Sequence, residues 1–285
     1  MNGPHQGGWI HTKYGEDWFI HFQDKGPYGR VCHLQPVDWS SGWPVMGNAG
    51  EPYWKFRKPK SDSKTIVNPV ETDEFDSSKL GMQWQWQNDY KESYGQATSM
   101  GFFRLFTYAL PELGDVSNLW YVPNMLLQKT PADEFTATTK LSFCSRNSDQ
   151  YVGLVCMSAE YSSVGLQRTE DGYELQIRHN PNAMRTHLTD EVLTVDTLKP
   201  TQKGTPRKGR PAEMHIKDVY LRMSIKDSKV NYAYSIDGKK WKKAGGEYAM
   251  GKGRWIGSKI GFFAVDPNKT GRKGFIDIDW FRISR

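Results

Sequence analysis

Residues 135–143 read FTATTKLSF, and this stretch decides the fold class. Apolar side chains occupy every second position except 139, which is a threonine, and threonine, lysine or serine stands between them. A period of two is typical of a β-strand with one face on a core and the other in water. The same alternation recurs in residues 173–178 and 219–226. The apolar residues expected on the core-facing side of these three strands are Phe135, Ala137, Leu141, Phe143, Tyr173, Leu175, Ile177, Val219, Leu221, Met223 and Ile225.

Similar strands follow one another along residues 76–285, separated by turn signals such as Asp237-Gly238. No stretch sustains a helical period beyond about two turns. We therefore expect an all-β fold, and the strand spacing favours a two-sheet sandwich of jelly-roll type. Trp84 and Trp86 share one parity of a single strand. Because an indole buries a large area, we expect both in the core, with a glycan-stacking platform as the alternative.

The first 48 residues contain shorter strands that are rich in aromatic side chains. Strands are expected at residues 9–12, 17–22 and 29–35, with a fourth at 45–46. Four antiparallel strands make one propeller blade, whereas a whole propeller needs about four to eight blades. A sheet this small is marginal in water by itself. It is therefore expected either to pack on the sandwich or to belong to a domain that is mostly missing here.

Residues 49–75 separate these two zones. Prolines and small polar residues dominate the stretch, and no periodicity is sustained in it. Such a composition is typical of a connecting segment. The predicted organisation is an incomplete propeller blade over residues 1–48, a linker over 49–75 and a β-sandwich over 76–285.

Charge and composition exclude several classes of protein. Lys and Arg total 38 against 32 Asp and Glu, and much of the excess lies in residues 199–217. That stretch also contains prolines and glycines, which favour a solvated loop over a polyanion site, and no nucleic-acid motif accompanies it. No apolar run approaches the ~18 residues of a membrane span. We expect neither a nucleic-acid nor a membrane partner.

The ends of the chain and its cysteines add little. The first residues show neither the basic head nor the apolar core of a signal peptide, and the compartment stays open, a periplasmic or secreted parent enzyme included. The three cysteines lack metal-ligand spacing, and their odd number argues against a disulfide framework.

An ordered set of motifs in the first zone carries a family resemblance. The segments are GPHQGGW (3–9), WFIHFQD (18–24), YGR (28–30), HLQPV (33–37) and GWPV (42–45). This set resembles the last blade of glycoside hydrolase family 43, whose members are five-bladed β-propellers and include β-xylosidases and α-L-arabinofuranosidases. Residues 80–87, 151–154 and 274–281 are similar to the concanavalin-like sandwich appended to many members. The resemblance implies about one blade of a five-bladed propeller followed by a concanavalin-like jelly-roll β-sandwich.

The same resemblance implies substrate-binding residues. His5 and Gln6 lie in the segment that matches the family's motif near the propeller axis, and Arg30 matches the arginine that hydrogen-bonds sugar hydroxyls. A guanidinium offers several donors in a fixed fork, which suits vicinal hydroxyl groups. Phe22 or Trp9 would stack on a sugar ring. The expected ligand is an oligosaccharide derived from hemicellulose.

The catalytic residues are expected outside this chain. Glycoside hydrolysis needs a carboxylic acid and a second carboxylate, and in this family both belong to earlier blades. Glu16, Asp17 and Asp24 occupy turn-like positions and match neither role. The resemblance thus implies the C-terminal part of an inverting, exo-acting glycosidase that is inactive alone. Its missing N-terminal blades would be a partner, on the same parent chain or on a separate polypeptide. The alternative is a non-catalytic carbohydrate-binding module.

Two ion sites are also implied by the resemblance. A calcium or other central ion would lie near His5, and Asp279 matches the place where related jelly rolls hold a structural calcium. Carboxylates and carbonyls are suitable ligands for that hard cation, although a solvated or capping aspartate is the simpler interpretation of Asp279. Four histidines in the first 33 residues have spacings that match no zinc motif. No organic cofactor is expected.

Overall fold

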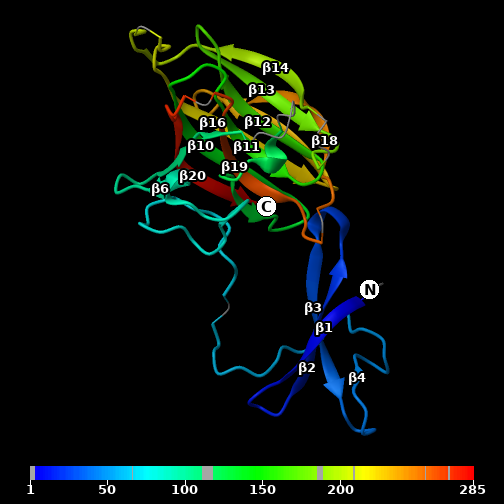
Figure 1. Cartoon of the computed structure of the whole chain (residues 1–285). Coiled ribbons are helices and arrows are strands. Elements are labelled where there is room, and N and C mark those ends of the chain that lie inside the picture. Colours follow the sequence, from blue (N-terminus) through cyan, green and yellow to red (C-terminus); the bar gives the residue numbers. More distant parts are fainter. Residues whose placement is uncertain are drawn as a thin grey trace. The chain divides into compact units, whose positions relative to one another are not determined.

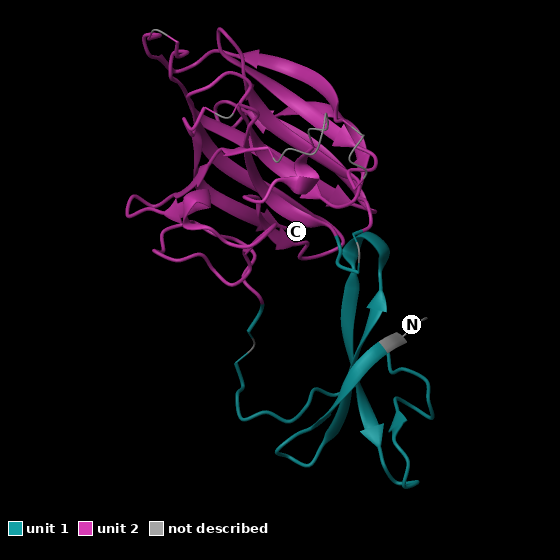
Figure 2. Cartoon of the chain, in the orientation of Figure 1, with its two compact units in different colours: residues 1–68, 253–257 teal, residues 69–252, 258–285 magenta. Residues whose placement is uncertain are grey.

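The computed structural model describes residues 4–65, 67–110, 118–184, 189–207, 209–253, 255–268 and 270–285, with side chains from residue 6 onward. The chain forms two compact units (Figure 2). Unit 1 comprises residues 1–68 with 253–257, and unit 2 comprises residues 69–252 with 258–285. Among the described residues the helices are three short 3-10 turns, and none has the length and hydropathy to cross a membrane.

Unit 1 is built on one four-stranded antiparallel sheet. Its strands follow one another in chain order: β1 (Pro4–His11), β2 (Asp17–Asp24), β3 (Arg30–Asp38) and β4 (Val45–Met46). The turn η1 (Gly26–Tyr28) joins β2 to β3. This up-and-down order is that of a propeller blade, so the four strands expected from the sequence are confirmed.

Both ends of the segment 49–75 pack against a sheet. In unit 1, the Phe56 ring lies 5.9 Å from that of Trp18, and the main-chain N–H of Tyr53 donates to the Gln35 side chain at 2.7 Å. In unit 2, Asp73 forms an isolated bridge with Phe281 in the last strand. The border between the two units falls at residues 68 and 69, within the segment predicted to be a linker.

Unit 2 contains two eight-stranded sheets (Figure 1). Across the first sheet lie β18 (Lys242–Ala249), β17 (Lys229–Ser235), β16 (Met214–Lys226), β10 (Phe135–Ser145), β20 (Phe275–Ser284), β7 (Phe103–Phe106) and β6 (Gly95–Ala97), and β15 (Gln202–Lys203) also pairs with β16. Across the second lie β14 (Glu191–Leu198), β13 (Tyr173–Asn180), β12 (Tyr161–Arg168), β11 (Tyr151–Met157), β19 (Lys259–Asp266), β9 (Leu126–Lys129) and β5 (Gln85–Trp86), and β8 (Tyr108–Ala109) pairs with β19. The turns η2 (Glu92–Tyr94) and η3 (Leu119–Tyr121) complete the unit.

The core lies between these two sheets. The alternating residues of β10, β13 and β16 are buried as expected, and the rings of Phe143 and Tyr173 meet across the interface with centroids 5.3 Å apart. Buried hydroxyls also join the sheets: Tyr173 donates to the Met214 carbonyl and Tyr232 to the Ser162 carbonyl, each at 2.7 Å. Face-to-face packing of this kind defines a β-sandwich.

The basic stretch 199–217 corrects one expectation. It was predicted to be a solvated loop throughout, but β16 already begins at Met214, and Met214 and Ile216 are buried. The alternation of these two apolar residues with His215 and Lys217 continues the strand pattern, and it outweighs the charge of the segment. The described residues from 204 to 213 are mainly exposed loop.

Candidate functional site

Unit 1 brings two of the expected substrate-binding residues together. In the β2–β3 register, Phe22 faces Cys32 and Asp24 faces Arg30, so Phe22 and Arg30 are diagonal neighbours on one face of the sheet. The guanidinium carbon of Arg30 lies 4.3 Å from the centroid of the Phe22 ring. This distance is within the range of cation–π attraction, which orients the exposed Arg30 side chain.

A second aromatic residue reaches the same guanidinium from far along the sequence. Trp255, in the part of unit 1 contributed by residues 253–257, has its ring centroid 6.0 Å from the Arg30 guanidinium carbon. Gly29 permits this approach, because it bridges to Ile256 with a φ of 74°, and a Cβ added to it would meet the Gly257 nitrogen at 2.1 Å. Trp255 itself has a positive φ of 67°, a conformation that bulky residues rarely adopt and that often marks a functional position.

This arrangement is suited to recognising a polyhydroxylated ligand. The Arg30 guanidinium lies near two aromatic rings, and no carboxylate in the described part of the chain forms an ion pair with it. Its N–H groups can therefore donate to hydroxyl oxygens. The side chain of Trp255 is 68% exposed and offers a flat apolar surface. Sequence reasoning missed Trp255, although its place between Gly253 and Gly257 was a signal for an aromatic residue in an unusual backbone.

The other expected residues are less closely grouped. Gln6 is exposed, at an irregularity of β1 between Pro4 and Gly7. The side chain of His5 lies outside the described residues. Trp9 pairs with Phe19 and therefore belongs to the face of the sheet opposite Phe22. Its indole N–H donates to Asp17 at 2.8 Å, so Trp9 is not part of the Arg30 cluster.

The carboxylates of Glu16 and Asp17 in unit 1 are committed to structural contacts. The main-chain N–H of Lys60 and the Arg57 guanidinium hold the pKa of Glu16 below its ordinary value. Hydrogen bonding by His11 and Trp9 does the same for Asp17. A general acid must carry a proton near the working pH, so these lowered pKa values argue against that role for Glu16 and Asp17.

Asp279 lies in the sandwich of unit 2, at a bulge of β20. Residues 278 and 280 pair with Leu141 and Lys140 of β10, which leaves Asp279 as the extra residue. The Lys140 ammonium lies 2.9 Å from Asp279 and 3.1 Å from Asp218, and these carboxylates raise the pKa of that lysine. A resident ammonium already supplies positive charge there, so these residues fit an ion pair better than calcium. The ion expected near His5 stays a prediction, because the His5 side chain lies outside the described residues.

Trp84 lies in the core, as expected. Its side chain is 8% exposed, its ring packs against those of Phe75, Phe262 and Phe281, and its indole N–H donates to Asp73 at 2.7 Å. The half-buried Trp86 ring contacts other rings of the same unit. The alternative of a glycan platform on Trp84 is therefore wrong, because a buried indole cannot stack on a sugar.

The family profile described as "Beta xylosidase C-terminal Concanavalin A-like domain" matches residues 72–284, which make up most of unit 2. The chain belongs to glycoside hydrolase family 43. A family-43 protein of Bacillus licheniformis has the same fold in its crystal structure, with a TM-score of 0.76 and 25% identity over 98% of this chain and 53% of that one. The fold class inferred from the family-43 motifs is thereby confirmed.

Curated relatives match nearly the whole chain, the first zone included. A protein of Xylanibacter ruminicola is 30% identical over 268 residues, which are 92% of this chain and 44% of the relative. A protein of Formosa agariphila named "Beta-xylosidase" is 27% identical over 93% of this chain and 45% of its own length. The chain thus spans less than half the length of these two relatives.

Proposed function

We propose that this chain is the C-terminal part of an exo-acting, inverting glycosidase that releases xylose or arabinofuranose units from hemicellulose-derived oligosaccharides. The observation that carries the proposal is the Arg30 guanidinium beside Phe22 and Trp255. This cluster would form one wall of a sugar pocket, with hydrogen-bond donors for hydroxyls and an aromatic surface for a ring. The names of relatives support the substrate class: beta-xylosidase in one case and non-reducing end alpha-L-arabinofuranosidase in another.

The acid and base of the reaction would come from other blades of the propeller. In the inverting mechanism, two carboxyl groups stand about 6.5–9.5 Å apart on either side of the scissile bond. The Glu16 and Asp17 carboxylates are held by structural contacts, and Asp24 accepts from the main-chain N–H of Gly26 at 2.9 Å in the following turn. We therefore propose that unit 1 binds the sugar and does not itself cleave the bond.

Exposed apolar side chains support a further part of the enzyme beside unit 1. Ile20 faces Leu34 in the β2–β3 register, and Ile10 lies on the same face of the sheet by its pairing with Trp18. The exposed fractions are 44% for Ile10, 40% for Ile20 and 38% for Leu34. Adjoining apolar residues on one face are typical of an interaction surface. Phe22 and Arg30 belong to the same face by this register. In a propeller, Ile10, Ile20 and Leu34 would pack on a neighbouring blade, on the same polypeptide or on a separate one, and the end of the face with Phe22 and Arg30 would stay open to the sugar.

The proposal is tested by reconstitution. The 285-residue chain is assayed on an aryl β-xyloside and an aryl α-L-arabinofuranoside, alone and after co-expression with the N-terminal catalytic half of a family-43 relative. We expect background rates alone and saturable hydrolysis with the partner. In the active complex, Arg30→Ala should lower kcat/KM by about a hundredfold, the loss expected for a charged hydrogen bond to substrate.

Two results would count against this function. Saturable turnover by the chain alone, abolished by a substitution within it, would show that the acid and base are present here. Normal kcat/KM for Arg30→Ala in an active complex would remove Arg30 from the pocket. Arg282→Ala is the matched control, because Arg282 is an exposed arginine of unit 2 whose guanidinium pairs with Glu74.

A further inference from the structure

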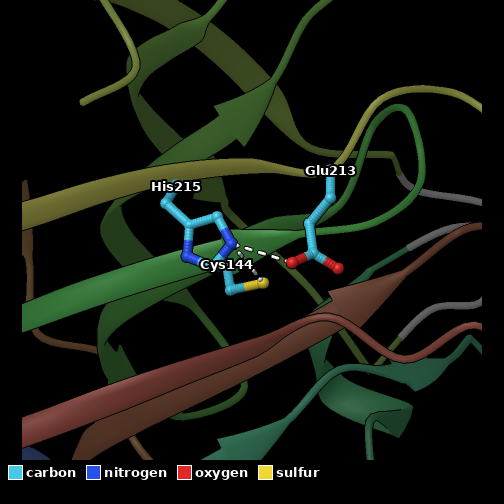
Figure 3. Close-up of side chains that lie close together, drawn as sticks. All are labelled: Cys144, Glu213 and His215. Carbon is cyan, nitrogen blue, oxygen red and sulfur yellow. Dashed lines mark hydrogen bonds and ion pairs between the residues drawn. The ribbon is translucent and has the colours of Figure 1, made fainter. Parts of the chain in front are cut away.

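Three side chains with metal-binding atoms meet on the outer face of the first sheet of unit 2. Cys144 of β10 and His215 of β16 are directly opposite each other in the strand register. Glu213 precedes His215 by two residues, and in extended chain that spacing puts both side chains on the same face. Figure 3 shows the thiol, the imidazole and the carboxylate turned toward one another. Their ligand atoms all lie within 4.8 Å of one another.

The contacts of Cys144 and Glu213 converge on a single ring nitrogen of His215. Nε2 of His215 lies 2.9 Å from Oε1 of Glu213 and 3.5 Å from Sγ of Cys144. The second carboxylate oxygen of Glu213 accepts from Nε of Arg146 at 2.8 Å, which fixes the plane of the carboxylate. Oε1 is thereby directed at the histidine and the thiol.

This geometry differs from that of a nucleophilic triad. In such a triad the nucleophile and the carboxylate contact opposite nitrogens of the histidine, so that a proton can pass from one side to the other. Here both contacts involve Nε2, which in any one tautomer is either donor or acceptor. Burial raises the pKa of the Cys144 thiol to about 12, whereas reactive cysteines have lowered pKa values. Covalent catalysis by Cys144 is therefore not supported.

The same convergence suits a cation. We propose that Cys144, Glu213 and His215 form a binding site for a zinc-type divalent metal ion. Thiolate, imidazole and carboxylate are the ligands that Zn²⁺ takes in proteins, and a tetrahedral ion with usual bond lengths separates sulfur from nitrogen by about 3.5 Å. The observed separation of Sγ and Nε2 has this value. The carboxylate would move away from Nε2 by a few tenths of an ångström to complete the set.

Surrounding groups are compatible with a bound ion. Cys144 and His215 line a hollow of about 240 Å³, which leaves room for water as a fourth ligand. Arg146 would remain on the outer carboxylate oxygen and hold Glu213 in place, as residues behind a metal ligand commonly do. On binding, the thiol proton would pass to solvent, because a coordinating thiol is deprotonated by its ion. The ion would tie β10 to β16, independently of the proposed glycosidase activity.

Cobalt substitution tests the site in the full chain without an affinity tag. The metal-free protein is titrated with Co²⁺, and we expect a near-ultraviolet thiolate-to-cobalt band together with the visible bands of a tetrahedral ion, saturating at one equivalent. Zn²⁺ should then displace Co²⁺ and remove the bands. Cys144→Ser should abolish the thiolate band, and Glu213→Gln and His215→Gln should each weaken Zn²⁺ binding at least about tenfold.

Two other cysteines provide matched controls. Cys156 is buried in the second sheet and Cys32 is exposed in unit 1, and substituting either one with Ser should leave the bands unchanged. A thiolate band that persists in Cys144→Ser, or that disappears in Cys32→Ser, would overturn the proposal. So would Zn²⁺ binding of equal strength in wild type and Glu213→Gln, which would indicate an adventitious site. Circular dichroism of each variant establishes that the fold is retained, and Glu213→Gln serves if Cys144→Ser does not fold.

Discussion

Replacing Trp84 with alanine distinguishes a role in the core from a role in ligand binding. The substitution removes an indole that packs against three aromatic rings, and truncation of a buried Trp costs about 3–5 kcal/mol of the free energy of unfolding. Asp73 also loses the donor at 2.7 Å, so we expect the upper part of this range. For a unit of this size the midpoint of thermal unfolding should fall by about 6–20 °C. Trp84→Phe keeps most of the packing and should lose less.

Thermal and urea unfolding, followed by circular dichroism, measure this effect. Trp54→Ala is the matched control, because Trp54 is 83% exposed and a surface substitution usually changes stability by less than about 0.5 kcal/mol. Affinity electrophoresis in xylan is run on the same variants. The reasoning is refuted if Trp84→Ala unfolds at the wild-type midpoint and loses retention in xylan, since a surface platform would give that result.

Three further substitutions test other parts of the structure. Burial raises the pKa of Asp190 above 3.8, so the folded protein binds this proton more tightly than the unfolded chain, and the contribution of Asp190 to stability is lost as pH rises from 3.8 through the folded-state pKa. Asp190→Asn should remove this contribution from the pH dependence of the free energy of unfolding, measured in urea between pH 3 and 8, and an unchanged pH dependence would contradict the expectation. Tyr232→Phe, which loses a buried bond of 2.7 Å between the sheets, should lower the free energy of unfolding by about 0.5–1.5 kcal/mol, and a stabilised variant would count against that bond. Gly29→Ala should displace Trp255 and lower kcat/KM of the reconstituted enzyme about tenfold or more, whereas Gly15→Ala should not, because a Cβ at Gly15 has open space around it. Equal effects of the two substitutions would show that Trp255 does not belong to the pocket.

Local alternation allowed most of the strands to be predicted. In β10 each buried residue is two positions from the next over Phe135–Leu141, and a period of two has one simple explanation in a half-buried sheet. The strands β1 to β4 were recovered from a different signal, short aromatic-rich stretches in the first 48 residues. The strand prediction failed at Met214 because net charge and prolines were given more weight than two alternating apolar residues.

The candidate sites were harder to predict, because they depend on pairing between distant strands. Arg30 and Phe22 were found through a family motif, but Trp255 reaches them through the bridge between Gly29 and Ile256. The cysteine and histidine of the proposed metal site are likewise neighbours only in the register of β10 with β16. A search for ligands at fixed sequence spacing does not detect pairs of this kind. Alternation within one strand shows which side chains share a face, but it does not show which distant strand lies beside it, as β16 lies beside β10.

The assignment of residues 253–257 to unit 1 has a practical meaning for recombination within the family. A chimera that exchanged the sandwich at residue 69 alone would replace this short segment together with unit 2. It would then combine a foreign loop with the native Gly29. Neither Gly29 nor Gly257, which faces it, has space for a Cβ. Gene shuffling that exchanges residues 253–257 together with residues 1–68 should yield more functional hybrids than a single crossover at residue 69.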